Sequence, residues 1–454
     1  MLSLLIPLLL AQTPTAPPPE PQTISVPQQV YPLPGELDQV PVFNSNSPEL
    51  VQTEGILLST FPTEGKAVPD AHLDYRFNGR FDVFAHHVAR APTPDDLRTL
   101  YLGVVLHNPG LTTVTVDVLQ AASYLSQPDA PFIQLPPMVD NPRGTVYAGP
   151  GSRVMSDILR GQRQEGWPAQ IAIPPGESRL LMNAPIPVST LDPPINGRST
   201  LARLRSNGSV YAASLARYAP TDAAGNEREP TLEEWQQLLA TGSLAGPRDR
   251  TPTPPGEAGQ LIYGRVAGVA IGSTWNAQVQ DANHPQGRLS IPAPGESKSY
   301  LLSGLDRGTF GTGQIQSAPL VVRYPDTAYA AHGNYGIHYR VHLPLHNRSE
   351  VPQRVAVTLQ TPLKTDEARS DLQFLEPLPS RVFFRGTVRV RYRDDQGVAR
   401  TRYVHLVQQQ GQQGEPLVIL NLDPDQANLV QVDFLYPPDA TPPQALTLQG
   451  LSLD

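Results

Sequence analysis

The sequence predicts a mainly β protein of two β-sandwich-like halves, with Pro/Gly-rich turns and one or two short helices. The 454 residues include 51 Pro and 35 Gly, and an interior Pro removes a hydrogen bond from a helix and clashes with the preceding turn. Apolar and polar residues alternate with a period of two in many segments, which is typical of half-buried strands. One strand pattern also recurs late in the chain, which indicates two related halves.

Composition excludes several functional classes. The formal net charge of −8 argues against general nucleic-acid binding, which needs a positive field over much of the surface. The absence of Cys excludes disulfides, thiolate zinc sites, iron–sulfur clusters and Cys nucleophiles.

The beginning of the chain predicts export. Residues 1–11 (MLSLLIPLLLA) are apolar and are followed directly by Pro-rich polar sequence, as in a secretory signal peptide. This run is too short to cross a bilayer, which takes about 20 apolar residues, and we expect no integral membrane segment in the mature chain. Residues 12–49 are expected to form an extended, unpacked Pro-rich tether. The expected location is the periplasm, the cell surface or the medium.

Two hairpins are predicted from turn signals. Asn78-Gly79 lies between two short alternating segments and predicts a two-residue type I′ turn. The second hairpin is expected from Thr387–Arg393 through the turn at 394–397 into Val398–Val407.

Two pairs of repeated motifs divide the remaining chain. Leu106-His107-Asn108 and Leu345-His346-Asn347 each lead through a short turn into an alternating strand. Ile173–Ser178 and Ile291–Ser297 share a Pro-Gly-Glu-Ser turn before an apolar segment. We expect sandwich-like domains at 50–218 and 260–454, with strands able to interleave between them.

Residues 219–259 predict an insertion that carries a short helix. Thr231, with Glu234 three residues later, has the pattern of a capping box, and Gly242 is expected to end the helix. A second helix is expected over Ser152–Arg160, because apolar residues recur there at helical spacing.

Motifs for catalysis and for metal binding are weak. The chain lacks Gly-x-Ser-x-Gly, His-Glu-x-x-His and Gly-x-Gly-x-x-Gly patterns. His338, His342 and His346 lie in a predicted strand, where residues four apart are separated by about 13 Å, too far to share one ion. We therefore expect no catalytic residues, no metal and no cofactor.

Arginine is concentrated in the second predicted hairpin. Residues 381–402 hold seven Arg and only two acidic residues. If the turn pairs Asp394 with Gly397, Arg391 faces Arg400 across the hairpin, and such a ladder of like charges needs carboxylates from elsewhere or an anionic partner. A register shifted by one residue would place Arg391 opposite Thr401 and remove the ladder. The candidate anion- or glycan-binding residues are Arg385, Arg389, Arg391, Arg393, Arg400 and Arg402.

Several C-terminal motifs carry a resemblance to a known family. They are Asn334-Tyr335-Gly336, Leu345-His346-Asn347, Gln360–Leu363, Arg381–Gly386, Arg402–Leu406 and Tyr436–Pro443. With these motifs the chain resembles an uncharacterised domain-of-unknown-function family of exported cyanobacterial proteins. The resemblance implies an envelope or secreted setting and supplies no catalytic residues.

The sequence leaves three functions open. The first is an exported structural or binding protein of the cell envelope without catalytic activity, whose partner is envelope polysaccharide or envelope protein and not nucleic acid. The second is an acidic-glycan or carbohydrate-binding protein that uses the Arg-rich β-face, with Trp167 or Trp275 as a stacking platform. The third is a glycan-active hydrolase with a pair of carboxylates from distant strands.

Overall fold

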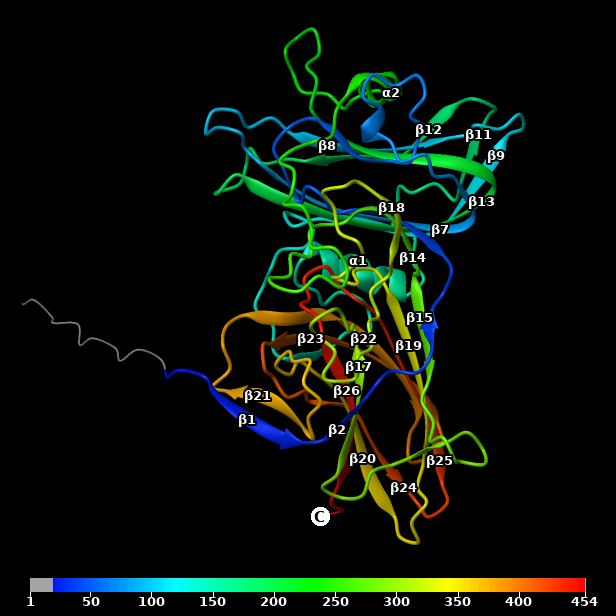
Figure 1. Cartoon of the computed structure of the whole chain (residues 1–454), viewed down its shortest axis with the longest axis vertical. Helices are drawn as coiled ribbons and strands as arrows, with labels where there is room; N and C mark the ends of the chain where they lie inside the picture. The colour runs from blue at the N-terminus through cyan, green and yellow to red at the C-terminus, as the bar shows by residue number, and fades with distance from the viewer. Residues whose placement is uncertain (1–18, 454) are drawn as a thin grey trace, which may run out of the picture.

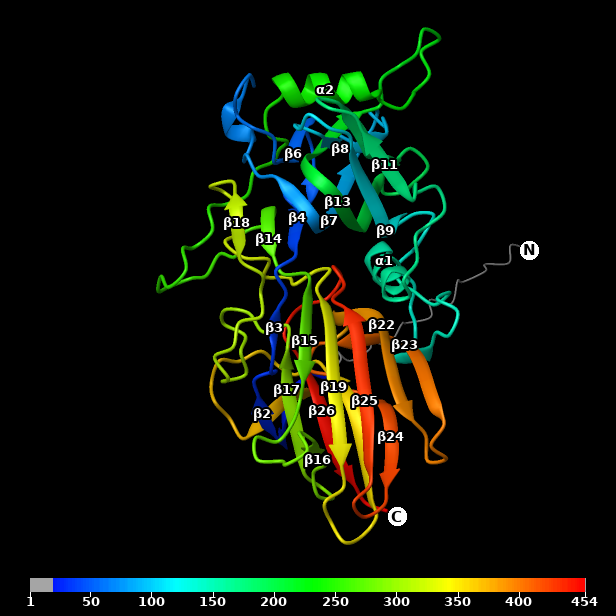
Figure 2. The same ribbon diagram turned by 90° about the vertical axis from the view of Figure 1, so that its right-hand side faces the viewer.

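The computed structural model describes residues 19–453, so the predicted signal peptide lies outside the described residues. Two β-sandwich-like halves are stacked along the long axis of the molecule, with helix α1 (Pro150–Leu159) between them (Figures 1 and 2). The predicted fold class is confirmed, because the protein is mainly β. No helix within residues 19–453 is long and apolar enough to span a membrane.

The upper half in Figure 1 has two facing layers that share one long strand, β13 (Ile195–Tyr218). The first part of β13 pairs with β7 and β9, and its second part pairs with β6 and β8. The apolar faces of the two layers form one core. The other strands are β4 (Pro41–Ser45), β5 (Leu50–Val51), β6 (Gly55–Ser59), β7 (Phe77–Arg90), β8 (Leu100–His107), β9 (Val114–Leu125), β11 (Gln170–Ile173), β12 (Ser178–Ile186), β14 (Ala267–Ile271) and β18 (Leu320–Arg323).

The lower half has two main sheets around a second core. One sheet contains β3 (Glu36–Leu37), β10 (Met138–Asp140), β15 (Thr274–Gln278), β16 (Leu289–Ser290), β19 (His338–His346), β22 (Val382–Arg393), β23 (Ala399–Gln409) and β25 (Ala427–Leu435). The facing sheet contains β2 (Gln29–Tyr31), β17 (Ser297–Leu302), β20 (Gln353–Gln360), β24 (Pro416–Leu422) and β26 (Gln444–Leu451). A two-stranded sheet pairs β1 (Gln22–Pro27) with β21 (Asp371–Glu376).

The two halves repeat one strand arrangement. β8 pairs with β12 and β9 with β11 in the upper half, as β19 pairs with β25 and β20 with β24 in the lower half. Asn108 and Asn347, which follow β8 and β19, make the same contacts. The Asn108 amide donates to the carbonyls of Thr112 (2.7 Å) and Ile173 (2.8 Å). The Asn347 amide donates to those of Val351 and Leu422, each at 2.8 Å.

The second motif pair is not equivalent in the structure. Ile173–Ser178 joins β11 to β12, and the matching connection in the lower half is Leu422–Ala427, between β24 and β25. Ile291–Ser297 instead precedes β17, which pairs with β26. The shared Pro-Gly-Glu-Ser letters therefore mark a similar turn, not a repeated position.

Two local predictions are wrong. The expected unpacked tether includes β1, β2, β3 and β4, all paired in sheets, and Leu33 is fully buried. Asn78-Gly79 lies within β7 and not in a hairpin turn. Gly79 has φ of +73° and lies next to an irregularity in the β7–β13 pairing. Its left-handed backbone conformation is therefore part of a bulge between two long strands.

Both predicted helices are present. α2 (Leu232–Thr241) begins with the predicted capping box: Thr231 accepts a hydrogen bond from the Glu234 amide, and the Glu234 carboxylate accepts one from the Thr231 amide. The helix ends at Gly242. The apolar face of α1 is buried between the two halves. A 3₁₀ turn, η1 (Pro69–Ala71), lies between β6 and β7.

Candidate functional site

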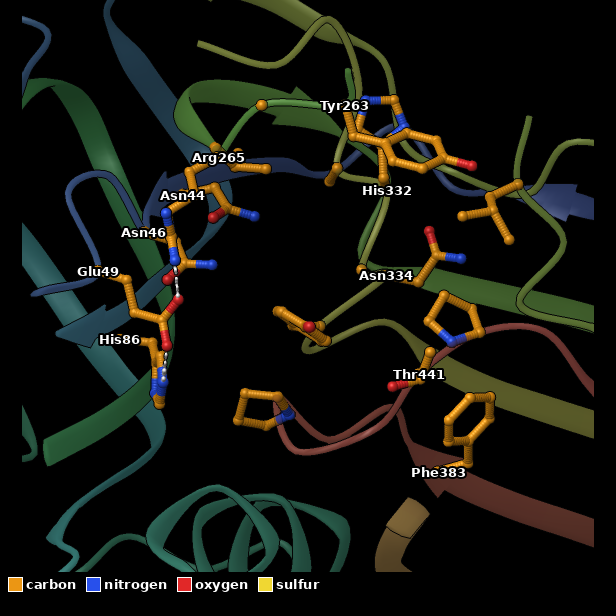
Figure 3. Close-up of a pocket in the computed structure, with 18 of the residues that line it drawn as sticks. Asn44, Asn46, Glu49, His86, Tyr263, Arg265, His332, Asn334, Phe383 and Thr441 are labelled. Carbon is orange, nitrogen blue, oxygen red and sulfur yellow. Dashed lines mark hydrogen bonds and ion pairs between the residues drawn. The ribbon is translucent and has the colours of Figure 1, made fainter. Parts of the chain in front are cut away.

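A cavity of about 500 Å³ lies between the two halves (Figure 3). The upper half contributes Asn44 on β4, His86 on β7 and the segment that follows β4. The rest of the wall comes from the segments before β14 and β19, the residues just before and at the start of β22, the β25–β26 connection, and Leu305, Lys364 and Gln410 in the segments after β17, β20 and β23. Segments from many parts of the chain thus meet at one site. Neither half forms this cavity alone. The lining side chains that the argument uses are Asn44, Asn46, Glu49, His86, Tyr263, Arg265, His332, Asn334, Tyr335, Lys364, Arg381 and Phe383.

Three asparagines give the cavity unused hydrogen-bonding capacity. The side-chain oxygens of Asn44, Asn46 and Asn334 are buried, and none has a hydrogen-bond partner within the described part of the chain. Asn334 has φ of 53°, a left-handed conformation that is uncommon outside glycine. Buried polar atoms are normally paired, so three unpaired oxygens in one cavity suit a polar ligand.

One carboxylate, Glu49, lies in the wall that the upper half provides. It accepts a hydrogen bond from Arg265 at 2.9 Å, and Arg265 also contacts Asp249 at 3.1 Å. His86 Nε2 lies 4.0 Å from Glu49, and burial lowers the pKa of His86. The charge of Glu49 is therefore balanced within the protein.

The opposite wall is aromatic and cationic. Lys364 donates a hydrogen bond of 2.9 Å to the Tyr263 hydroxyl, which in turn donates to the Asp306 carbonyl at 2.5 Å. The Tyr263 and His332 rings lie 4.7 Å apart. Burial lowers the pKa of His332 to about 4 and raises that of Tyr263 to about 12, so both are neutral at pH 7.

Two cations of this wall form no ion pair among the described residues, although Asp366 and Asp306 act on Lys364 from a greater distance. The Arg381 guanidinium lies 5.1 Å from the centre of the Phe383 ring. Within residues 19–453, neither Arg381 nor Lys364 has a carboxylate at ion-pair distance. The cavity thus combines aromatic rings, free amide oxygens and an excess of positive charge.

The lining carries one carboxylate side chain, so a pair for glycoside hydrolysis is lacking there. Asp439 lies next to the lining residue Pro438 and is partly buried, and desolvation raises its pKa to about 6. Within the described part of the chain, no group of three or more potential metal ligands occurs.

The Arg-rich hairpin forms in the shifted register, so the predicted ladder is absent. Arg391 lies opposite Thr401, and Arg402 opposite Val390. Because cross-strand partners point to the same face, Arg400 and Arg402 lie on the opposite face of the sheet from Arg389 and Arg391. The β22–β23 hairpin itself is confirmed.

The candidate arginines mostly have partners inside the protein. Arg389 and Arg391 contact Asp433 at 3.2 and 3.1 Å, Arg400 contacts Asp394 at 2.7 Å, and Arg402 contacts Asp140 at 2.8 Å. Arg393 donates to the Gly397 carbonyl at 2.8 Å. Arg385 lies over the Phe132 ring, 5.1 Å from its centre. Among the described residues, four of the six candidate arginines thus pair with carboxylates, whereas Arg385 and Arg393 form no ion pair, and an anionic partner at the hairpin stays a prediction.

Comparison with known families gives one match over most of the chain. Residues 28–450 match the family described as "Protein of unknown function (DUF3370)". The chain belongs to the DUF3370 family. The predicted resemblance to an uncharacterised family is confirmed, whereas export and a cyanobacterial source stay predictions.

Other comparisons add little for this DUF3370 protein. No curated protein matches the chain. A structure of the coconut allergen cocosin is 10% identical over 82% of this chain and 77% of the other, with a TM-score of 0.10. A procruciferin 11S globulin from Brassica napus is 11% identical over 95% and 85%, with a TM-score of 0.09. Scores this low carry no argument about fold or function.

The cavity residues of the DUF3370 chain were not predicted from the sequence. They come from segments that lie far apart in the chain, and no spacing rule links them. Two weak signals exist: Asn44 and Asn46 alternate on one strand end, and Asn334 stands before Tyr335-Gly336, where a left-handed turn residue fits.

Proposed function

We propose that this protein is a non-catalytic binding protein of the cell envelope that holds an acidic saccharide in the cavity between its two halves. The observation that carries the proposal is that three asparagines with unpaired side-chain oxygens line the same cavity as aromatic rings and two cations without ion pairs. Export is proposed from the apolar run at residues 1–11.

The chemistry of the walls favours a sugar over an apolar ligand. Sugar hydroxyls can donate to amide oxygens that have no other partner, and a ring such as Phe383 offers a flat apolar surface to one face of a pyranose. Cavities that bind small molecules usually combine apolar walls with a few polar groups of this kind.

The charge balance favours an acidic sugar over a neutral one. Glu49 is already compensated by Arg265, whereas Arg381 and Lys364 lack acidic partners among the residues described. A carboxylate on the ligand would form ion pairs with these two side chains. Binding rather than hydrolysis is proposed because the lining offers Glu49 without a second carboxylate side chain.

The test is calorimetric titration of the purified protein with oligogalacturonate and with a neutral oligosaccharide of equal length. We expect salt-sensitive binding of the acidic oligomer that weakens at least tenfold in Arg381→Gln and in Asn46→Ala. Arg400→Gln is the matched control, because Arg400 is exposed and lies on the hairpin far from the lining residues. Binding lost equally in all three variants would contradict the site.

Three further outcomes would overturn other parts of the proposal. Release of new reducing ends from the oligomer would replace binding by hydrolysis, with Glu49 and Asp439 as the carboxylates to test first. Recovery of the protein in the cytoplasmic fraction of its host would contradict the envelope location. Absence of binding to any saccharide would favour a structural role.

A further inference from the structure

A second cavity of about 310 Å³ opens at an edge of the upper half. Its walls come from β9, β12, β13 and the turn at 164–168, so it leads from the surface toward the space between the two layers. It shares no lining residue with the cavity between the halves. Any ligand here would therefore bind independently of the proposed function.

A buried arginine without a carboxylate partner lines this cavity. Arg198 on β13 is 7% exposed. Its Nε and Nη2 donate to the Pro185 carbonyl at 3.1 and 2.8 Å, and its Nη1 donates to the Ser123 hydroxyl at 3.0 Å. No ion pair to Arg198 occurs among residues 19–453.

The contacts of Arg198 leave part of its guanidinium unused. A guanidinium carries five N–H groups, and the three hydrogen bonds occupy three of them. Burial lowers the pKa of Arg198 to about 10, yet the group stays charged at pH 7. Asp129 acts on this charge only from beyond ion-pair distance. A buried charge without a direct ion pair is costly, and an anion in the cavity would offset that cost through charge-assisted hydrogen bonds.

An indole lies in the same wall. Trp167 lines the cavity and is partly exposed, whereas Trp235 and Trp275 are 0% and 5% exposed. A partly exposed indole next to polar groups is a good surface for stacking a sugar ring. Glu165, the acidic side chain of the lining, lies on the exposed turn and forms no ion pair with Arg198.

We propose that this edge cavity binds the carboxylate of a single uronic acid residue, with Arg198 contacting the carboxylate and Trp167 contacting the sugar ring. A volume of about 310 Å³ has room for a single sugar residue. The site lies away from the Arg-rich hairpin and from Arg381.

The test uses glucuronate as the acidic probe and glucose as its neutral counterpart. Because Trp167 is the more exposed indole, glucuronate should change the intrinsic fluorescence of the intact protein, and Trp167→Phe should abolish that change. Calorimetry should show at least tenfold weaker binding in Arg198→Gln. Arg381→Gln should bind glucuronate at this site as the unmodified protein does.

Several outcomes would overturn the inference. They are binding of glucuronate in Arg198→Gln with unchanged affinity, equal binding of glucose, absence of any signal at millimolar glucuronate, or binding of inorganic sulfate as tight as that of glucuronate. If Arg198→Gln does not fold, Trp167→Ala gives the same information, since that side chain is partly exposed. Loss of binding only in Arg381→Gln would assign the signal to the cavity between the halves.

Discussion

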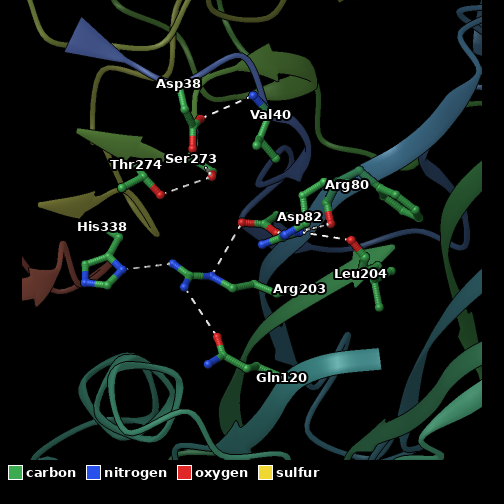
Figure 4. A network of polar contacts seen from close by, with 11 residues as sticks. Asp38, Val40, Arg80, Asp82, Gln120, Arg203, Leu204, Ser273, Thr274 and His338 are labelled. Atoms are coloured by element: carbon green, nitrogen blue, oxygen red, sulfur yellow. Dashed lines mark hydrogen bonds and ion pairs between the residues drawn. The ribbon is translucent and has the colours of Figure 1, made fainter. Parts of the chain in front are cut away.

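The Arg203 guanidinium and the His338 imidazole lie 3.5 Å apart and join the two halves of the molecule (Figure 4). Arg203 lies on β13 in the upper half and His338 on β19 in the lower half. Burial and nearby arginines hold the pKa of His338 well below its usual range, so its ring is neutral and can accept a hydrogen bond from Arg203. Arg203 also forms an ion pair with Asp82 at 3.7 Å.

Removing this acceptor should destabilise the contact between the halves. His338→Leu leaves the buried Arg203 Nη2 without its histidine partner, and an unsatisfied buried donor typically costs about 1–3 kcal/mol. We expect the free energy of unfolding in urea to fall by about that amount. His342→Leu on the same strand is the control, because His342 is partly exposed and should change stability by less than about 0.5 kcal/mol. An equal loss in both variants would contradict the role of the Arg203 contact.

Asp433 is the second buried charge near this boundary, and its replacement should strongly destabilise the protein. It is 1% exposed and contacts both Arg389 and Arg391. Breaking a buried ion pair by removing one member typically costs about 3–5 kcal/mol. Asp433→Leu should therefore lower the free energy of unfolding by about that amount, whereas Arg400→Gln should cost less than about 1 kcal/mol because its pair with Asp394 is exposed. Urea unfolding measures both losses. A similar loss of unfolding free energy in the two variants would show that burial does not set the strength of these ion pairs.

Much of the fold could be predicted because it follows from local pattern. The capping box at Thr231 depends on residues three apart, and the β22–β23 hairpin depends on one continuous segment, so both were found. The Asn78-Gly79 hairpin failed because β13 supplies a long partner strand that overrides the local turn signal.

The surroundings of the candidate arginines in the β22–β23 hairpin could not be predicted, because they depend on strand register and on contacts between distant strands. A shift of one residue in the hairpin moved Arg391 from Arg400 to Thr401, and no sequence feature fixed that register. The carboxylate that neutralises Arg391 lies on β25, which the sequence alone could not place beside β22.

Stability should fall as the pH drops from about 6.5 to about 4, because several buried histidines resist protonation. Burial lowers the pKa values of His72, His87, His332 and His405 to about 4. In this window the unfolded chain binds protons at these histidines and the folded chain does not, so acid favours unfolding. Above about pH 7.5 both states are neutral at these positions, and the histidines add little pH dependence.

Asp439 should oppose this trend, and His405 provides the sharpest test of it. Burial raises the pKa of Asp439 to about 6, so the folded state binds that proton first, and this one group favours folding as the pH falls toward 4. Burial also raises the pKa values of Asp82 and Asp157, and it lowers those of His86, His107 and His338, so the histidines outnumber the carboxyls. A full proton on any one of these groups changes the free energy of unfolding by about 1.4 kcal/mol per pH unit. His405→Gln should therefore reduce the slope of unfolding free energy against pH by up to about that amount, measured by urea unfolding between about pH 7 and pH 5. His342→Gln, which alters a partly exposed histidine, should leave the slope nearly unchanged. A slope unaffected by His405→Gln, or stability that rises on acidification, would contradict the assignment of buried neutral histidines.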